Sequence, residues 1–261
     1  MSVRRYAPNP RLASRVAAIV VVENGGGEAP VLPVPGAVMG VQFRGRIHAE
    51  QGPLSQAGVT GIQSTVRRFV HPEPTGSVLV RFTSQGAASL GLPAGELLDR
   101  SVSLDDVVGR ARTSELSEQV CEAQDDRARV LAVEQFLLEL PFASDALVMR
   151  ATELLARTDA LSVAETAATL GVSERQLERR FRDRVGVSPK QFARLARFER
   201  AMVVAKTQLP ATSLGPDDAL DSPPSLATIA QLAGYYDQSH LVRDVREFAG
   251  ATPKQLLSRS R

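Results

Sequence analysis

The sequence is poor in the residues on which disulfide and metal scaffolds depend. Its 261 residues include one cysteine and three histidines. The single cysteine, Cys121, excludes a disulfide framework within one chain and a zinc site built from several cysteines. His48 and His71, the only histidines of the N-terminal half, argue against a cupin-type metal cluster, and we expect both to be solvated or packed. We therefore expect no metal, no cofactor, no catalytic residues and no enzymatic activity.

Long apolar runs are also missing. No apolar stretch reaches the roughly 18 residues that a membrane-spanning helix needs. The N-terminus lacks the apolar core of a signal peptide. The length is sufficient for two domains with a sizeable core. We expect a soluble, cytoplasmic protein without a membrane partner.

Charge is small in total but unevenly distributed. The formal net charge of +2 would not by itself suggest a nucleic-acid partner. Residues 1–143 hold 14 arginines and 15 acidic residues, whereas residues 144–261 hold 17 basic and 14 acidic residues. Within residues 173–206 the count is ten basic against four acidic. A basic bias confined to one part of the chain favours nucleic-acid binding there.

Two stretches of the C-terminal half are copies of one another. Residues 173–183 (SERQLERRFRD) align with residues 237–247 (DQSHLVRDVRE), and residues 186–192 (GVSPKQF) align with residues 250–256 (GATPKQL). Both alignments have the same offset of 64 residues. Two copies indicate two similar units rather than a solenoid, which needs at least three repeats.

The first unit has the signals of two short helices separated by a tight turn. Ser162 and Glu165 form a capping box, and Gly171 ends the helix that follows. Ser173 then caps a second helix, with Gln176 as its partner. The inner stripe of this second helix has fourfold spacing: Leu177, Phe181 and Val185. Its outward side carries Arg175, Glu178, Arg179 and Arg182.

The second unit repeats this pattern. Ser225 caps its first helix, Gly234 ends that helix, and Asp237 caps the next one. The inner stripe consists of Leu241, Val245 and Phe248. The outer face carries Gln238, Ser239, Val242, Arg243 and Arg246.

A helix pair with a short glycine turn places its second helix in a DNA major groove. Arginine pairs with guanine and glutamine with adenine in that groove. Helix pairs of this kind are common and outward arginines are usually only solvated, but the repeat and the basic bias favour DNA. We therefore predict eight DNA-binding residues: Arg175, Glu178, Arg179, Arg182, Gln238, Ser239, Arg243 and Arg246.

A long helix is predicted between the two units. It begins at Pro189, which is tolerated in the first turn, and runs to about Lys206. These residues span about 27 Å at roughly 1.5 Å each. Recognition helices at its two ends could enter successive major grooves of double-stranded DNA, about 34 Å apart.

At residues 186–192 and 234–241 (GYYDQSHL) the chain resembles the AraC/XylS family of bacterial transcription regulators. The resemblance covers residues 144–261 and implies two helix-turn-helix units joined by a long helix. By position, it assigns base reading to Arg175, Glu178 and Arg179 in the first unit and to Gln238, Ser239 and Arg243 in the second.

The chain departs from that family in two places. Residues 242–246 (VRDVR) are less basic and less aromatic than is usual there, so we expect the second recognition helix to grip DNA more weakly. Residues 207–224 are longer than the usual connection and hold four prolines, three aspartates and no basic residue. We expect this segment to be a flexible surface loop.

The N-terminal half has the pattern of short strands. Alternating or β-branched runs at residues 16–22, 38–43, 66–70 and 77–82 predict a small antiparallel barrel or sandwich. Residues 113–140 return to helix and offer a dimerisation or docking surface with Val130, Val133, Phe136, Leu137 and Leu140. The adjacent Arg67 and Arg68 are either a solvated pair, which we favour, or a site for an anionic effector.

The sequence thus predicts an α+β protein with three parts. Residues 1–110 form a β-rich sensor domain, a small barrel or sandwich, and residues 111–143 form a helical linker or dimerisation region. Residues 144–261 form an all-α DNA-binding domain of two helix-turn-helix units joined by a long helix. The predicted function is a sequence-specific DNA-binding transcription regulator, in which the N-terminal domain senses a small molecule, forms a homodimer, or does both.

RNA polymerase is a further candidate partner. The alternative is a protein-interaction module whose N-terminal half holds an unrecognised enzymatic pocket.

Overall fold

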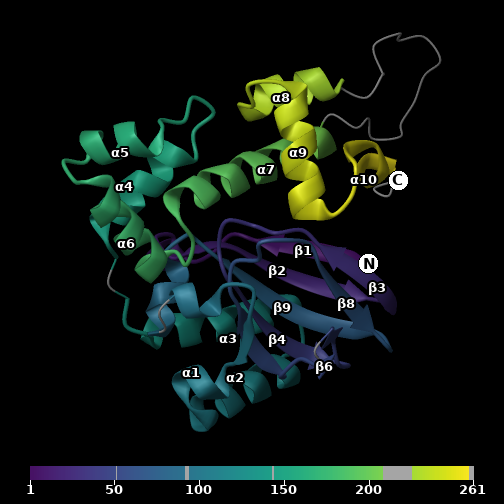
Figure 1. Ribbon diagram of the computed structural model, residues 1–261. Coiled ribbons are helices and arrows are strands. Elements are labelled where there is room, and N and C mark those ends of the chain that lie inside the picture. Colours follow the sequence, from purple (N-terminus) through teal and green to yellow (C-terminus); the bar gives the residue numbers. More distant parts are fainter. Residues whose placement is uncertain (51, 92–93, 143, 208–224, 259–261) are drawn as a thin grey trace.

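The computed structural model shows a β-rich N-terminal domain packed against a helical C-terminal domain (Figure 1). It describes residues 1–50, 52–91, 94–142, 144–207 and 225–258. The predicted surface loop at residues 207–224 therefore lies, apart from Thr207, outside the described residues.

Six antiparallel strands form the larger sheet, in the spatial order β1-β2-β9-β4-β7-β10. They are β1 (Ser2–Tyr6), β2 (Val16–Asn24), β4 (Val38–Arg44), β7 (Ala57–Thr60), β9 (Thr75–Phe82) and β10 (Ser101–Ser103). A second sheet has the order β3-β8-β5-β6. Its strands are β3 (Gly27–Val31), β5 (His48–Ala49), β6 (Gly52–Pro53) and β8 (Arg67–His71). The predicted fold class, with a β-rich first domain and an all-helical second one, is confirmed.

The four strands predicted from alternation correspond to β2, β4, β8 and β9. The remaining strands were not predicted because they are short or lie at sheet edges, where charged and exposed residues interrupt the apolar pattern. Strand β1, for example, has the sequence SVRRY, and it is held by an antiparallel ladder to β2 rather than by burial of its own side chains.

The two faces of the larger sheet pack against different partners. Met39, Val41, Val78 and Val80 alternate along β4 and β9 and belong to the core of the first domain, together with residues of the helices beneath the sheet. The opposite face, with Gly40 and its neighbours in alternation, is turned toward the second sheet. Both faces are thus covered, which explains why β9 is mostly buried along its whole length.

Helical segments complete the first domain. They are η1 (Pro10–Leu12), η2 (Gly86–Leu90), η3 (Ala94–Leu97), α1 (Asp105–Val108), α2 (Arg110–Glu122) and α3 (Asp126–Glu139). The stretch expected to be helical, residues 113–140, contains two helices, because Asp125 accepts a hydrogen bond from the Ala128 amide at 2.8 Å and starts the second one. The apolar residues offered for dimerisation or docking are buried within this chain: Val130, Val133, Phe136, Leu137 and Leu140.

The second domain consists of seven helices in its described part. They are α4 (Ala146–Leu155), α5 (Val163–Thr169), α6 (Glu174–Arg184), α7 (Pro189–Thr207), α8 (Leu226–Ala233), α9 (Gln238–Ala249) and α10 (Pro253–Ser258). Figure 1 shows α4 to α6 at one end of α7 and α8 to α10 at the other. No described helix is both long enough and apolar enough to cross a lipid bilayer.

Aromatic packing fixes both groups of helices on α7. The Phe181 ring of α6 contacts the Phe192 ring of α7, with centroids 5.8 Å apart. Six residues further along α7, Phe198 contacts Phe248 of α9, with centroids 5.1 Å apart. All four side chains are at most 3% exposed. One helix therefore organises the core of the whole second domain.

Two segments of the first domain, residues 60–67 and 94–101, together contact α9 and α6. We call these two segments the brace. Its η3 part packs against α6, and the Val66 amide donates to the Phe248 carbonyl of α9 at 2.7 Å. Asp99 joins the two halves of the brace, because its carboxylate accepts from the Ser64 amide and the Ser64 hydroxyl, each at 2.6 Å. The domains are also linked by an ion pair between Arg81 and Glu199 of α7.

We predict that Gly186→Ala destabilises the protein more than Gly171→Ala. Both glycines have positive φ, +96° and +67°, and each alanine should cost about 1–2 kcal/mol for that conformation alone. A Cβ at Gly186 would also lie 2.6 Å from the Ala94 carbonyl oxygen of η3, whereas a Cβ at Gly171 meets nothing within 4 Å. Urea unfolding should show the larger loss for Gly186→Ala, and equal losses would mean that the contact between η3 and α6 is not tight.

Candidate nucleic-acid interface

The first helix-turn-helix unit is fixed locally by two reciprocal caps. The Glu165 amide donates to the Ser162 hydroxyl at 3.2 Å, and the Ser162 amide donates to the Glu165 carboxylate at 2.8 Å. Hydrogen bonding of the Glu165 carboxylate by the Ser162 side chain, and then by the Ser162 amide, lowers the pKa of Glu165. Ser173 and Gln176 form the same pair of bonds at the start of α6, at 3.2 and 2.9 Å. Because each capping box satisfies amides that a helix leaves free, the sequence alone sets where both helices begin.

Helix α6 buries one side and presents the other to solvent. Leu177 and Phe181 are fully buried, as the predicted inner stripe requires. The four residues predicted to bind DNA from this helix are all exposed: Arg175, Glu178, Arg179 and Arg182. Their neighbour Arg180 is instead paired with Asp145 at the start of α4, at 2.9 Å. Arg180 therefore holds α6 in place, whereas Arg175, Arg179 and Arg182 are presented outward.

The second unit has the same construction with different caps. The Ser225 hydroxyl accepts from the Thr228 amide at 3.1 Å, and the Asp237 carboxylate accepts from the His240 amide at 2.8 Å. Gly234 ends α8 in the left-handed conformation, with φ +79°. A Cβ there would lie 2.5 Å from the Thr158 carbonyl oxygen, so glycine is required by both conformation and space.

The predicted DNA-binding residues of α9 lie together on its outer face. Gln238, Ser239, Arg243 and Arg246 are exposed and, with the half-buried Val242, line one shallow hollow. Gln238 and Ser239 occupy the first turn, which is the part of a recognition helix that contacts base edges.

Tyr236 was not predicted as a site residue, and it is 93% exposed in the turn just before α9. The sequence signal that could have indicated Tyr236 is the pair of adjacent tyrosines. The other tyrosine of this pair, Tyr235, is buried. Burial raises the pKa of Tyr235 far above its ordinary value, which keeps that hydroxyl protonated. One tyrosine therefore packs the turn, and the other extends from it beside the polar face of α9.

An ionic network holds α9 at a defined place on α7. Arg194 of α7 donates to Asp244 at 2.7 Å and to Glu247 at 2.6 Å, and its guanidinium lies 5.1 Å from the Phe248 ring centroid. The Asp244 side chain is 4% exposed. The hydrogen bond from Arg194 to the Glu247 carboxylate lowers the pKa of Glu247. These three contacts lie on the side of α9 opposite its exposed polar face, so they set its orientation.

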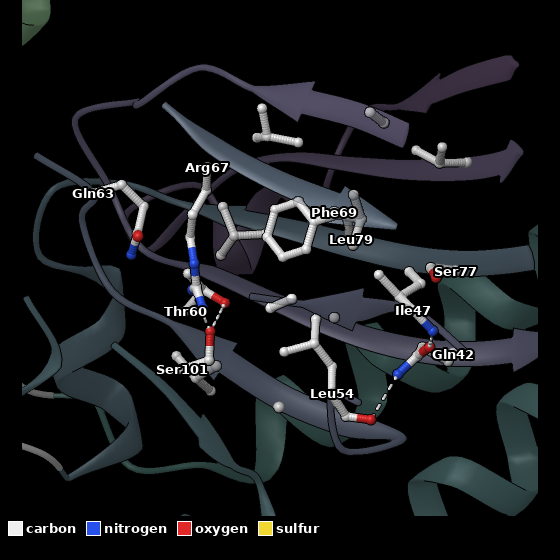
Figure 2. A pocket seen from close by; sticks show the side chains of 18 of the residues that line it. Gln42, Ile47, Leu54, Thr60, Gln63, Arg67, Phe69, Ser77, Leu79 and Ser101 are labelled. Atoms are coloured by element: carbon white, nitrogen blue, oxygen red, sulfur yellow. Dashed lines mark hydrogen bonds between the residues drawn. The ribbon is translucent and has the colours of Figure 1, made fainter. Parts of the chain in front are cut away.

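A second candidate site is a cavity of about 410 Å³ in the first domain, between the two sheets. Figure 2 shows Arg67, Thr60, Gln63 and Ser101 gathered at one end. Phe69, Leu54 and Leu79 lie in the middle, and Gln42 and Ser77 at the other end. His71 also lines the cavity; burial lowers the pKa of this histidine, which favours its neutral form.

The chain is similar to known proteins in structure but not in sequence. No protein-family model matches the chain, and no curated protein matches its sequence significantly. Among solved structures, an apo ToxT variant from Vibrio cholerae has 12% identity over 92% of this chain and 97% of its own, with TM-score 0.49. ToxT from the same species bound to unsaturated fatty acid has 10% identity over 97% and 96%, with TM-score 0.49.

A transcriptional regulator with an AraC-type DNA-binding domain from Chromobacterium violaceum has 23% identity over 43% of this chain and 90% of its own, with TM-score 0.33. This chain is similar to AraC-type regulators. The roles of the eight predicted residues stay a prediction from their own chemistry and placement.

We predict that Asp244→Ala lowers the free energy of unfolding by about 2–4 kcal/mol, because it leaves Arg194 partly buried without its inner partner. Arg157→Ala is the matched control: it breaks the Arg157–Asp159 pair, whose side chains are 57% and 71% exposed, and should cost under about 1 kcal/mol. Urea denaturation of both variants measures the difference. Similar small losses would show that the network does not hold α9.

Proposed function

We propose that the chain is a sequence-specific DNA-binding transcription regulator. One observation carries the proposal: two copies of a helix-turn-helix unit lie at opposite ends of a single helix, and each exposes the polar face of its second helix. Bases are read by the exposed side chains of α6 and α9, and the buried stripes hold those helices in place. Double-stranded DNA is the partner.

The length of α7 supports contact with two successive grooves. Its 19 residues span about 29 Å at roughly 1.5 Å per residue, and successive major grooves on one face are about 34 Å apart. The side chains of α6 and α9 add to that span in both directions. One chain can thus place one recognition helix in each groove, with specificity shared between two short sets of contacts.

The exposed side chains suit the edges of bases. Arg175, Arg179 and Arg182 are able to pair with guanine, Gln238 with adenine, and Glu178 with the amino group of cytosine. Arg243 and Arg246 extend the face of α9 toward phosphates or guanine.

The first domain is the regulatory part in this proposal. A cavity of about 410 Å³ is within the range of small-molecule sites, about 300–1,000 Å³. It lies next to the brace, which contacts both recognition helices. A small-molecule effector bound there is close to the elements that position α6 and α9. Homodimerisation and contact with RNA polymerase are further parts of this proposal that DNA-bound samples would test.

Capture of genomic fragments by the purified protein, followed by gel shifts on those fragments, tests the function. Neutralising several phosphates releases counterions, so affinity should fall about a thousandfold or more between roughly 50 and 200 mM salt. Enrichment of a common sequence supports the proposal. Weak binding without enrichment would favour instead a protein-interaction module.

We predict that Arg179→Ala lowers affinity for a captured site by about 1–3 kcal/mol and relaxes the preference at one base pair, if the side chain reads a guanine. Arg150→Ala is the control, because Arg150 is also exposed but is paired with Glu153 on α4, outside α6. Competition gel shifts with specific and random DNA measure both. An equal loss on the two DNAs would make Arg179 a phosphate contact.

We also predict that a fragment of residues 144–261 keeps the sequence preference of the whole chain. Its net charge is +3, against −1 for residues 1–143, and both recognition helices lie within it. Its melting temperature should fall, because Ile62 of the first domain is buried in the core of the second. Footprints of fragment and full chain on one site check this. A folded fragment that protects no sequence would show that the first domain takes part in reading.

A further inference from the structure

The cavity between the sheets is chemically different at its two ends. Arg67 lies at one end, half-buried, with its guanidinium 5.5 Å from the Phe69 ring centroid and donating to the Ser101 hydroxyl at 2.7 Å. Among the described residues lining the cavity it is the side chain with a permanent charge, and it forms no ion pair with a described carboxylate. Arg68 beside it points the other way and pairs with Glu28 at 2.7 Å. Arg68 is thus directed to the protein surface, and Arg67 is directed to the cavity.

The far end of the cavity holds a polar group without a partner. Ser77 is 3% exposed, and its hydroxyl forms no hydrogen bond with any described residue. The nearby Gln42 is fully occupied, since its amide donates to Ser55 and accepts from Ile47, each at 2.7 Å. A buried hydroxyl left unpaired costs free energy that a ligand atom at hydrogen-bond distance would recover.

Between these ends the walls are apolar and one wall is reduced to backbone. Gly40 of β4 pairs with Gly58 of β7, and both line the cavity. The missing side chains leave room beneath Phe69, Leu54 and Leu79. The two ends differ by four residues along β4, from the level of Val38, which pairs with Thr60, to Gln42, which pairs with Ser77. At roughly 3.4 Å per residue this is about 14 Å.

We infer that this cavity binds an elongated, mainly apolar molecule with one anionic end and one hydrogen-bonding end. Arg67 binds the anionic group, the apolar middle lies over the paired glycines, and Ser77 bonds the far polar group. This inference rests on the proposed function, for which it names the class of effector. A carboxylate is the simplest anionic group that pairs with two of the guanidinium nitrogens at once.

The anionic group acts on the brace. In the structure Arg67 bonds to Ser101, which in turn shares a hydrogen bond of 2.8 Å with Thr60, so the side chain joins the two halves of the brace. A ligand carboxylate competes with Ser101 for the guanidinium. The next residue, Val66, bonds the end of α9, and η3 in the other half packs against α6. Occupancy of the cavity therefore changes the relative position of the two recognition helices.

The test uses the full chain and three amphiphiles of equal length: ω-hydroxydecanoate, decanoate and decanol, each below its micellar concentration. Calorimetry should show the tightest binding for ω-hydroxydecanoate, and loss of its carboxylate should weaken binding at least about tenfold. Arg67→Gln should abolish the difference between ω-hydroxydecanoate and decanol. Ser77→Ala should abolish the difference between ω-hydroxydecanoate and decanoate. Arg68→Gln is the matched control and should change neither difference.

Gly40→Val tests the site without removing a polar group. Its added Cβ would lie 3.2 Å from a methyl carbon of Leu79, so the Leu79 side chain must shift by a few tenths of an ångström while the valine occupies part of the cavity. It should block all three amphiphiles while melting as a folded protein. Absence of binding to the wild-type chain, or a carboxylate preference that survives Arg67→Gln, overturns the inference.

The effect on DNA is measured separately from binding. Addition of ω-hydroxydecanoate should change the affinity of the wild-type chain for a captured DNA site, and Arg67→Gln should not respond. Unchanged DNA affinity in the wild type, with the amphiphile bound, overturns the coupling through the brace. Because calorimetry needs no DNA, failure of the chain to bind DNA at all would count against the proposed function and leave the ligand site standing.

Discussion

The arrangement of the second domain depends on how α7 buries its phenylalanines. Phe192 packs against Phe181 of α6, and Phe198 packs against Phe248 of α9. A fully buried phenylalanine contributes about 1.5–3 kcal/mol, so each contact outweighs a surface ion pair several times over. Because both contacts start from one helix, the separation of the two exposed polar faces is set by the rise of that helix. Arg194 also fixes the orientation of α9 on α7, because it pairs with Asp244 on the buried side of α9.

The first domain adds a second constraint on the same two helices. Its brace reaches α6 through η3 and α9 through Val66, and the halves are joined by Asp99 and Ser64. Asp99 has positive φ, +57°, which is uncommon for a residue with a side chain. Its carboxylate makes two short hydrogen bonds that offset this strain. The cavity lies beside this joint, so a molecule bound there is near a point from which both α6 and α9 are held.

Much of the second domain could be predicted because its signals are local. The capping boxes of Ser162 and Ser173 involve residues three apart, and the left-handed glycines at 171 and 234 follow directly from helix ends. The four strands with apolar alternation were also found. The break between α2 and α3 was not predicted because residues 123–125 hold no glycine or proline, and only the cap at Asp125 marks the restart. Short edge strands such as β1 were missed because their pairing, not their own composition, makes them strands.

The amino-acid sequence by itself determined the two repeated units, their helix boundaries and the residues on each outer face, because caps and apolar stripes act over a few residues. Only the tertiary structure decided which of the adjacent Arg67 and Arg68 enters the cavity, since that depends on the face of β8 that the larger sheet covers. It also decided that Ser77 ends without a partner and that the helices at residues 110–139 bury their apolar face within the chain. These outcomes arise from contacts between residues far apart in sequence, which no local pattern encodes.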